Sequence, residues 1–108
     1  PLPAGALFED LCYHAQQAAE KALKAVHRHR ARPFRHVHSI EELLTGLRRY
    51  GLDVPSALDD AVHLTDYATD ARYPSTAEPV SREEHEVAVE TASRVVEWAA
   101  AVVGSPDV

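Results

Sequence analysis

The stretch from His14 to Ala25, which reads HAQQAAEKALKA, restricts the possible folds of this chain more than any other segment. It is rich in alanine and contains no glycine, proline or β-branched residue, so it strongly favours an α-helix. At about 100° per residue, the apolar residues in and around it share one broad arc: Phe8, Leu11, Cys12, Ala15, Ala18, Ala19, Ala22, Leu23, Ala25 and Val26. Because most of these side chains are small, neighbouring helices can approach closely on more than one side. The pattern predicts a central helix over residues 6–29.

Local signals along the rest of the chain predict three further helices. Pro33 disfavours helix at the residue before it and ends the first helix. Ser39-Ile-Glu-Glu42 and Ser81-Arg-Glu-Glu84 each match a capping box, in which the hydroxyl caps a backbone N–H and the glutamate reaches back. Gly51 is a candidate left-handed helix stop. The helices are expected at 6–29, 39–50, 56–72 and 81–103, which predicts an all-α, up-and-down four-helix bundle forming a single domain over residues 1–108.

The composition bears on where the protein is located and whether it associates with a membrane. It leaves open what the uneven charge of the chain is for. The single cysteine, Cys12, favours a reduced, cytoplasmic location. No apolar run approaches the ~20 residues that cross a bilayer, so we expect no membrane association. The net charge of −6 is uneven: residues 21–49 hold eight Lys/Arg and two Glu, whereas residues 50–108 hold three Lys/Arg and twelve Asp/Glu. This asymmetry suits a polyanion at one end, dimerisation by charge complementarity, or two merely solvated surfaces.

Three motifs give the chain a resemblance to a known family. The run from His14 to Lys24 resembles the signature helix of the prokaryotic HEPN domains. His38-Ser-Ile, followed by Glu41-Glu-Leu-Leu44, stands where that family has a histidine opening its next helix. Arg72-Tyr73-Pro74 matches an Arg-Tyr-Pro at the end of the third long helix. The three matches occur in the family's order over residues 8–100.

The resemblance implies a helical bundle that binds a nucleotide or RNA and often forms a homodimer. It also implies pairing with a minimal nucleotidyltransferase in a toxin–antitoxin-like system, with no cofactor and no metal. Many members of the family begin with one more helix before the signature helix, and we expect this chain to lack it.

Two groups of residues are candidates for nucleotide or RNA binding. His14, Gln17 and Lys21 line one strip of the first helix, either as a groove for a phosphate with Lys21 as its cation or as a hydrogen-bond network between helices. In the second group, Arg72 would hold a phosphate and the ring of Tyr73 would stack on the ligand. Arg72 could instead bond to a carboxylate such as Glu20 and lock the bundle.

An alternative function is that of a ribonuclease toxin. Catalytic HEPN proteins share a motif in which an arginine is followed four to six residues later by a histidine. They cleave RNA without a metal. Arg32 and His38 have this kind of spacing, with five residues between them, as do Arg30 and His36. The family's pair usually lies on a helix with a polar residue after the arginine, whereas Pro33 follows Arg32. Our candidate catalytic pair is Arg32 and His38.

Overall fold

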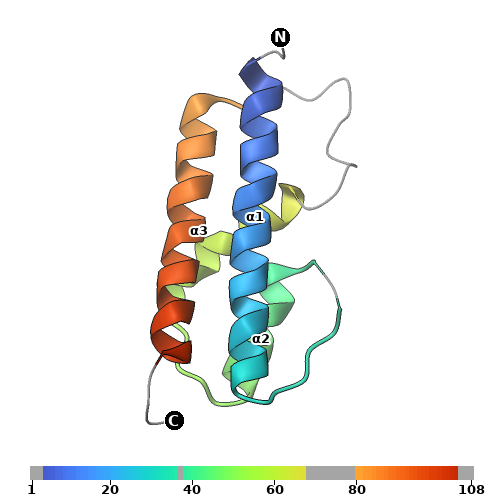
Figure 1. The fold of residues 1–108 in the computed structure, drawn as a ribbon, viewed down its shortest axis with the longest axis vertical. Helices are drawn as coiled ribbons and strands as arrows, with labels where there is room; N and C mark the ends of the chain where they lie inside the picture. Colours follow the sequence, from blue (N-terminus) through green and yellow to red (C-terminus); the bar gives the residue numbers. More distant parts are fainter. Residues whose placement is uncertain (1–3, 37, 68–79, 105–108) are drawn as a thin grey trace.

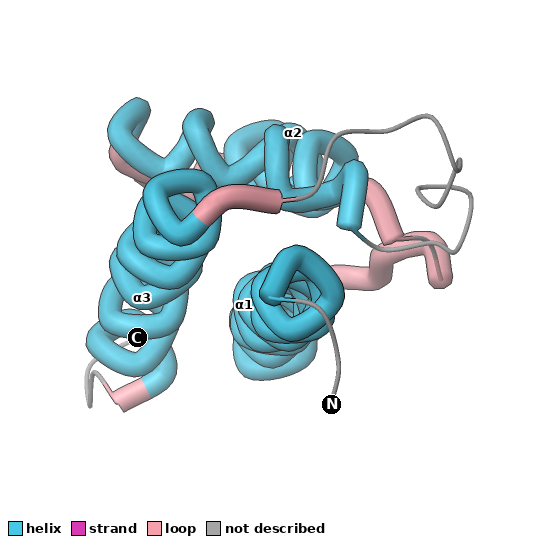
Figure 2. The backbone as a smooth tube through the Cα atoms, turned by 90° about the horizontal axis from the view of Figure 1, so that it is seen from above, coloured by secondary structure: helices cyan, strands magenta, loops and turns pink. Residues whose placement is uncertain are grey.

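The computed structural model describes residues 4–36, 38–67 and 80–104, and these residues form four helices and no strand. Two are long: α1 spans Ala4–His29 and α3 spans Arg82–Val103. Between them in sequence lie the short α2, Ile40–Arg49, and η1, Ser56–Tyr67, which is a 3₁₀-helix. Figure 1 shows α1 and α3 side by side and running in the same direction, and Figure 2 shows α2 with η1 across one side of that pair. The predicted all-α helical bundle is confirmed.

The first helix occupies the central position that its alanine arc predicts, because α1 packs against α2, η1 and α3. Its buried apolar residues are Cys12, Ala15, Ala19, Leu23 and Val26. Its partner α3 contributes a row of similar character, with Ala88, Ala92, Val95 and Ala99 in the same core. Small side chains on both helices allow their axes to approach. The buried arc is narrower than expected, since Ala18 and Ala25 are exposed.

The start and end signals of α2 act as predicted. The Ser39 hydroxyl accepts a hydrogen bond from the Glu42 N–H at 3.1 Å, and Gly51 adopts a φ of +93° after the last turn. The Glu42 carboxylate, however, pairs with Arg35 at 3.3 Å. The buried stripe is the one the periodicity indicates: Ile40, Leu43, Leu44 and Leu47. Ser81 caps α3 in the same way, through the Glu84 N–H at 3.0 Å.

The third helix differs from an ordinary α-helix. Its buried residues Leu58, Ala61 and Leu64 recur every three positions, which is the repeat of a 3₁₀-helix, in which side chains at i and i+3 eclipse. A period of 3.6 predicts a different inward face that includes Val62 and Thr65, and both are only half-buried. The Thr65 hydroxyl instead accepts a hydrogen bond from the Ile40 N–H at 3.1 Å and joins η1 to the start of α2. Residues 68–72 of the predicted helix lie outside the described residues.

No helix in the described ranges has the length and apolar character needed to cross a lipid bilayer.

Candidate functional site

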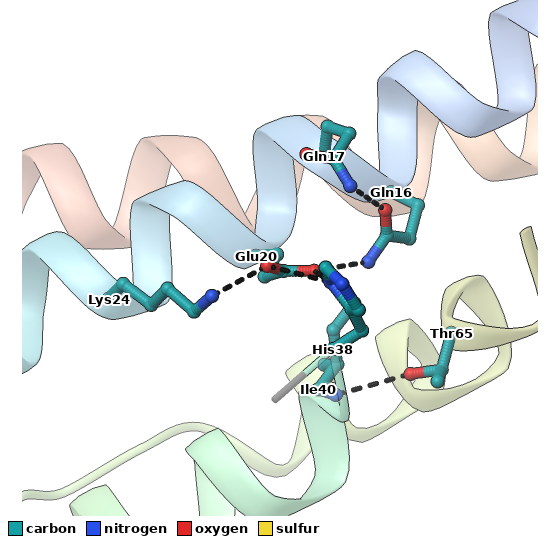
Figure 3. A network of polar contacts seen from close by, with 7 residues as sticks. All are labelled: Gln16, Gln17, Glu20, Lys24, His38, Ile40 and Thr65. Carbon is teal, nitrogen blue, oxygen red and sulfur yellow. Dashed lines mark hydrogen bonds and ion pairs between the residues drawn. The ribbon is translucent and has the colours of Figure 1, made fainter. Parts of the chain in front are cut away.

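A buried carboxylate in the middle of α1 organises a cluster of polar side chains (Figure 3). Glu20 is only 3% exposed. It accepts hydrogen bonds from Gln16 Nε2 at 2.6 Å and from Lys24 Nζ at 2.7 Å, both one helical turn away. His38, from the segment before α2, places Nδ1 at 3.0 and 3.2 Å from the two carboxylate oxygens. The cluster therefore ties the start of α2 to the centre of α1.

Opposing effects act on the pKa of Glu20, and the hydrogen bonds prevail. Burial raises the pKa, while the hydrogen bonds from Lys24, His38 and Gln16 and the charge of Lys24 lower it, with a net shift below 4.5. Glu20 is therefore ionised at neutral pH and can only accept protons in hydrogen bonds. The proton in the contact with His38 must lie on Nδ1. The other ring nitrogen, Nε2, then belongs to a side chain that is 61% exposed and can meet a ligand.

A second feature lies where α1 ends, at a surface with cations over aromatic rings. The guanidinium carbon of Arg28 lies 5.3 Å from the centroid of the Phe34 ring, and that of Arg32 lies 5.2 Å from the Tyr50 ring. Both distances are within the range of cation–π attraction. We use the name basic pole for Arg28, Arg32, Arg49, Phe34 and Tyr50.

A buried histidine supports the two aromatic rings of the basic pole. His27 is 1% exposed, and its Nε2 donates a hydrogen bond to the Leu43 carbonyl at 3.1 Å. Its ring centroid lies 5.2 Å from that of Phe34 and 6.2 Å from that of Tyr50. The Tyr50 hydroxyl also donates to the Pro33 carbonyl at 3.2 Å. These contacts fix the orientation of both rings without any ligand.

Tyr50 forms a wall of two surface hollows. One, of about 410 Å³, is also lined by Phe34, Arg35 and Arg49. The other, of about 230 Å³, is also lined by Arg30 and Arg32. An aromatic wall with guanidinium groups on both sides suits a planar base and its phosphate.

The arginines near this surface differ in whether their charge is neutralised. Arg35 pairs with Glu42 at 3.3 Å, and Arg48 pairs with Asp59 at 2.7 Å. Arg28, Arg32 and Arg49 pair with no carboxylate in the ranges that the structure describes. Lys21 and Arg30 also pair with no carboxylate in these ranges, so the basic pole holds three of the five uncompensated Lys and Arg side chains of residues 21–49.

The comparison with protein families is decisive for classification. The sequence model of the HEPN domain matches residues 4–102, nearly the whole chain. The chain belongs to the HEPN domain family. At this level it is a nucleotide- or RNA-related module. No individual curated protein and no solved structure matches it.

Of the three residues of the HEPN signature strip, the structure brings only Gln17 into contact with the buried cluster. His14 is exposed and lies 3.7 Å from Asp10, and Lys21 is exposed as well. Gln17 is half-buried and donates to Gln16 at 2.7 Å. The hydrogen-bond network between elements is formed by the adjacent row, Gln16, Glu20 and Lys24. Arg72 and Tyr73 lie outside the described residues, as does the expected bond from Arg72 to Glu20.

The candidate catalytic pair occupies two separate contact groups. Arg32 lies over Tyr50, and His38 is bonded to Glu20. Both belong to the irregular segment between α1 and α2, as Pro33 predicts. Their joint role in catalysis stays a prediction.

The apolar arc of the first helix does not include the residues that hold the site together. Gln16, Glu20 and His27 lie outside that arc, and all three are buried. A signal was present, because Gln16, Glu20 and Lys24 recur every four residues on one face. The partner of Glu20 is 18 positions away in sequence, and no periodic pattern identifies it.

Proposed function

We propose that this HEPN domain binds RNA or its nucleotides through the basic pole. The observation that carries the proposal is a group of three arginines, Arg28, Arg32 and Arg49, that pair with no carboxylate among the described residues. They lie beside two aromatic rings whose orientation is fixed by other contacts. Guanidinium groups bind phosphates in a bidentate manner, and aromatic rings stack on bases of any sequence. Sequence-tolerant binding of single-stranded RNA is the expected behaviour.

Fluorescence anisotropy with a labelled single-stranded RNA, in buffer with EDTA, tests this proposal. Arg32→Ala/Arg49→Ala removes two phosphate contacts and should weaken binding by about tenfold or more. Tyr50→Leu should weaken binding through lost stacking, by about 1–3 kcal/mol. The matched control is Arg82→Ala/Arg94→Ala on α3, which changes the net charge equally and should bind nearly as wild type. Equal losses in both double variants, or no binding by wild type, would contradict the proposal.

The proposal extends to the setting in which this domain acts. We infer that it forms a homodimer in the cytoplasm and works beside a minimal nucleotidyltransferase in a toxin–antitoxin-like pair. The support for this part is membership of the HEPN family. Co-expression with the product of the neighbouring gene and co-purification of the two chains tests the pairing, and gel filtration of each chain alone tests the dimer.

A second candidate function is metal-independent cleavage of RNA. The observation in its favour is the contact between Glu20 and His38, which fixes the proton on Nδ1 and leaves Nε2 on an exposed ring. In that position Nε2 can accept the proton of a ribose 2′-hydroxyl as it attacks the adjacent phosphate. The bond from phosphorus to the 5′-oxygen of the next nucleotide breaks, which leaves a 2′,3′-cyclic phosphate and a 5′-hydroxyl that takes its proton from water. Arg32 would stabilise the charge that develops on the phosphate.

Incubation of labelled RNA with the protein in EDTA separates the two functions. If the domain is a ribonuclease, wild type cuts and His38→Ala does not, while His29→Ala, an exposed histidine of the same region, cuts normally. If the wild type binds RNA and leaves it intact, the binding function stands and the ribonuclease is rejected.

A further inference from the structure

On another face of the molecule, η1 and α3 form a groove that the proposed function does not use. It is a hollow of about 640 Å³ with an apolar floor that includes Leu64, Val87 and Ala88. Val87, an apolar residue of α3, is 64% exposed. Exposed apolar side chains in a hollow with a polar rim are typical of protein-binding surfaces.

Acidic side chains from both helices form the rim of this groove. Asp60 and Asp66 come from η1, and Glu83, Glu84 and Glu90 come from α3. Glu90 pairs with Arg94 at 2.6 Å, and Glu84 accepts a hydrogen bond from the Tyr67 hydroxyl. Asp60, Asp66 and Glu83 have no cationic partner in the part of the chain that the structure describes. The occupant of the groove should therefore present both apolar surface and positive charge.

The basic pole has this combination of properties. Tyr50 is 39% exposed, and the hollows beside it are also lined by Arg32 and Arg49, which pair with no carboxylate in the part of the chain that the structure describes. Tyrosine and arginine, together with tryptophan, are enriched among the residues that carry most of the binding energy of protein interfaces. One chain thus carries an apolar groove with an acidic rim and, separately, an aromatic surface with a basic rim.

We propose that the groove between η1 and α3 receives the basic pole of a second copy of this chain. Tyr50 would contact the floor near Val87, while Arg32 and Arg49 would pair with Asp60 and Asp66. The pole would then be covered by protein, so a second copy and RNA would compete for the same arginines. The competition rests on the proposed function, whereas the contact between copies rests only on charge and apolar surface.

Sedimentation velocity with two charge-reversed variants tests the contact. The groove variant is Asp60→Lys/Asp66→Lys, and the pole variant is Arg32→Glu/Arg49→Glu. Wild type should self-associate in about 50 mM salt. The affinity between copies should fall by about tenfold or more in about 500 mM salt. Each variant alone should stay monomeric. A 1:1 mixture should associate again, because the intact pole of one variant meets the intact groove of the other.

The control Glu86→Lys/Glu97→Lys changes two α3 carboxylates that do not line the groove and should associate as wild type does. Circular dichroism confirms that each variant folds. A monomeric wild type at low salt, normal association of either charge-reversed variant, or a mixture that stays monomeric overturns the proposal.

Adding RNA to the associated wild type separates this inference from the proposed function. Release of monomers bound to RNA supports the competition. RNA that binds without changing the association overturns the competition. If RNA does not bind at all but the charge-reversed variants behave as expected, the proposed function fails and the contact between copies stands.

Discussion

At the scale of single residues, Glu20 determines how the start of α2 is attached to α1. Its charge is buried, but three side chains donate hydrogen bonds to it. Removing one partner of such a buried group leaves the others without compensation, and this costs more than the contact itself contributes. Glu20 is therefore the residue of the cluster whose substitution should affect stability most.

We expect Glu20→Gln to lower the free energy of unfolding by about 1–3 kcal/mol at neutral pH. The pKa of Glu20 is lower in the folded chain than its ordinary 4.5, so the folded state binds fewer protons. The stabilisation is thus fully present above that value and is lost as the pH falls below it. Urea unfolding of both proteins at several pH values should show the gap closing on acidification. Glu86→Gln, an exposed control, should show no such gap at neutral pH, and a Glu20→Gln gap that widened in acid would contradict this account.

The buried ring of His27 leaves little room for a side chain at Gly46. A methyl group on Gly46 would lie 3.1 Å from His27 Cε1, and that ring cannot easily move because it bonds to Leu43 and packs on Phe34 and Tyr50. Alanine favours a helix over glycine by about 1 kcal/mol, but crowding in a packed core costs about 1–3 kcal/mol.

Gly46→Ala should consequently destabilise the wild type, as measured by urea unfolding. In a His27→Ala background the obstacle is gone, and the same substitution should stabilise the protein. The reversal of sign separates a steric effect from a propensity effect. If Gly46→Ala stabilised both backgrounds, the ring would not be the constraint.

At the scale of elements, η1 shows how packing selects one helix type. The repeat of three places Leu58, Ala61 and Leu64 on one ridge against the core, whereas a repeat of 3.6 would turn Leu64 away and bring Val62 beside Leu58. Leu64 is buried and Val62 is only half-buried.

Replacing each of two alanines of η1, the buried Ala61 and the exposed Ala57, by leucine tests which face of this helix meets the core. Ala61→Leu should cost about 1–3 kcal/mol by overpacking, and Ala57→Leu should change the free energy of unfolding by less than about 0.5 kcal/mol. Thermal unfolding monitored by circular dichroism measures both. Equal destabilisation by the two substitutions would indicate that both positions face the core and that the ridge is assigned incorrectly.

At the scale of the whole molecule, the two charged surfaces separate onto different elements. The basic pole lies at the ends of α1 and α2 and the segment between them, while carboxylates gather on η1 and α3. A polyanion can therefore bind at one end of a chain whose net charge is −6, because salt screens the distant carboxylates within about 10 Å.

This distribution predicts how RNA binding depends on salt. The slope of log affinity against log salt concentration reports the number of phosphates that are neutralised, at about 0.7 per contact for single strands. Arg32→Ala/Arg49→Ala should reduce the magnitude of the slope by about 1–2, whereas Arg82→Ala/Arg94→Ala should leave it unchanged. Anisotropy titrations at several salt concentrations measure it. An unchanged slope in the first variant would place the phosphate contacts elsewhere.

Features that depend on neighbours within about four residues can be predicted from the order of the amino acids. The alanine arc predicted the central helix, the serine caps and Gly51 predicted the boundaries of α2, and the leucine stripe predicted its buried face. The motifs led to the HEPN family, and the uneven charge indicated a basic end. These signals are local, because helix periodicity and capping act over one or two turns.

Which polar row of α1 is buried, and what that row contacts, depends on how the helices pack. His14, Gln17 and Lys21 were the expected row, and Gln16, Glu20 and Lys24 are the row that meets His38. The 3₁₀ repeat of η1 and the two hollows beside Tyr50 were likewise invisible in the sequence. Each depends on where the chain returns after many residues, and that path is set by packing of the whole core rather than by any one segment.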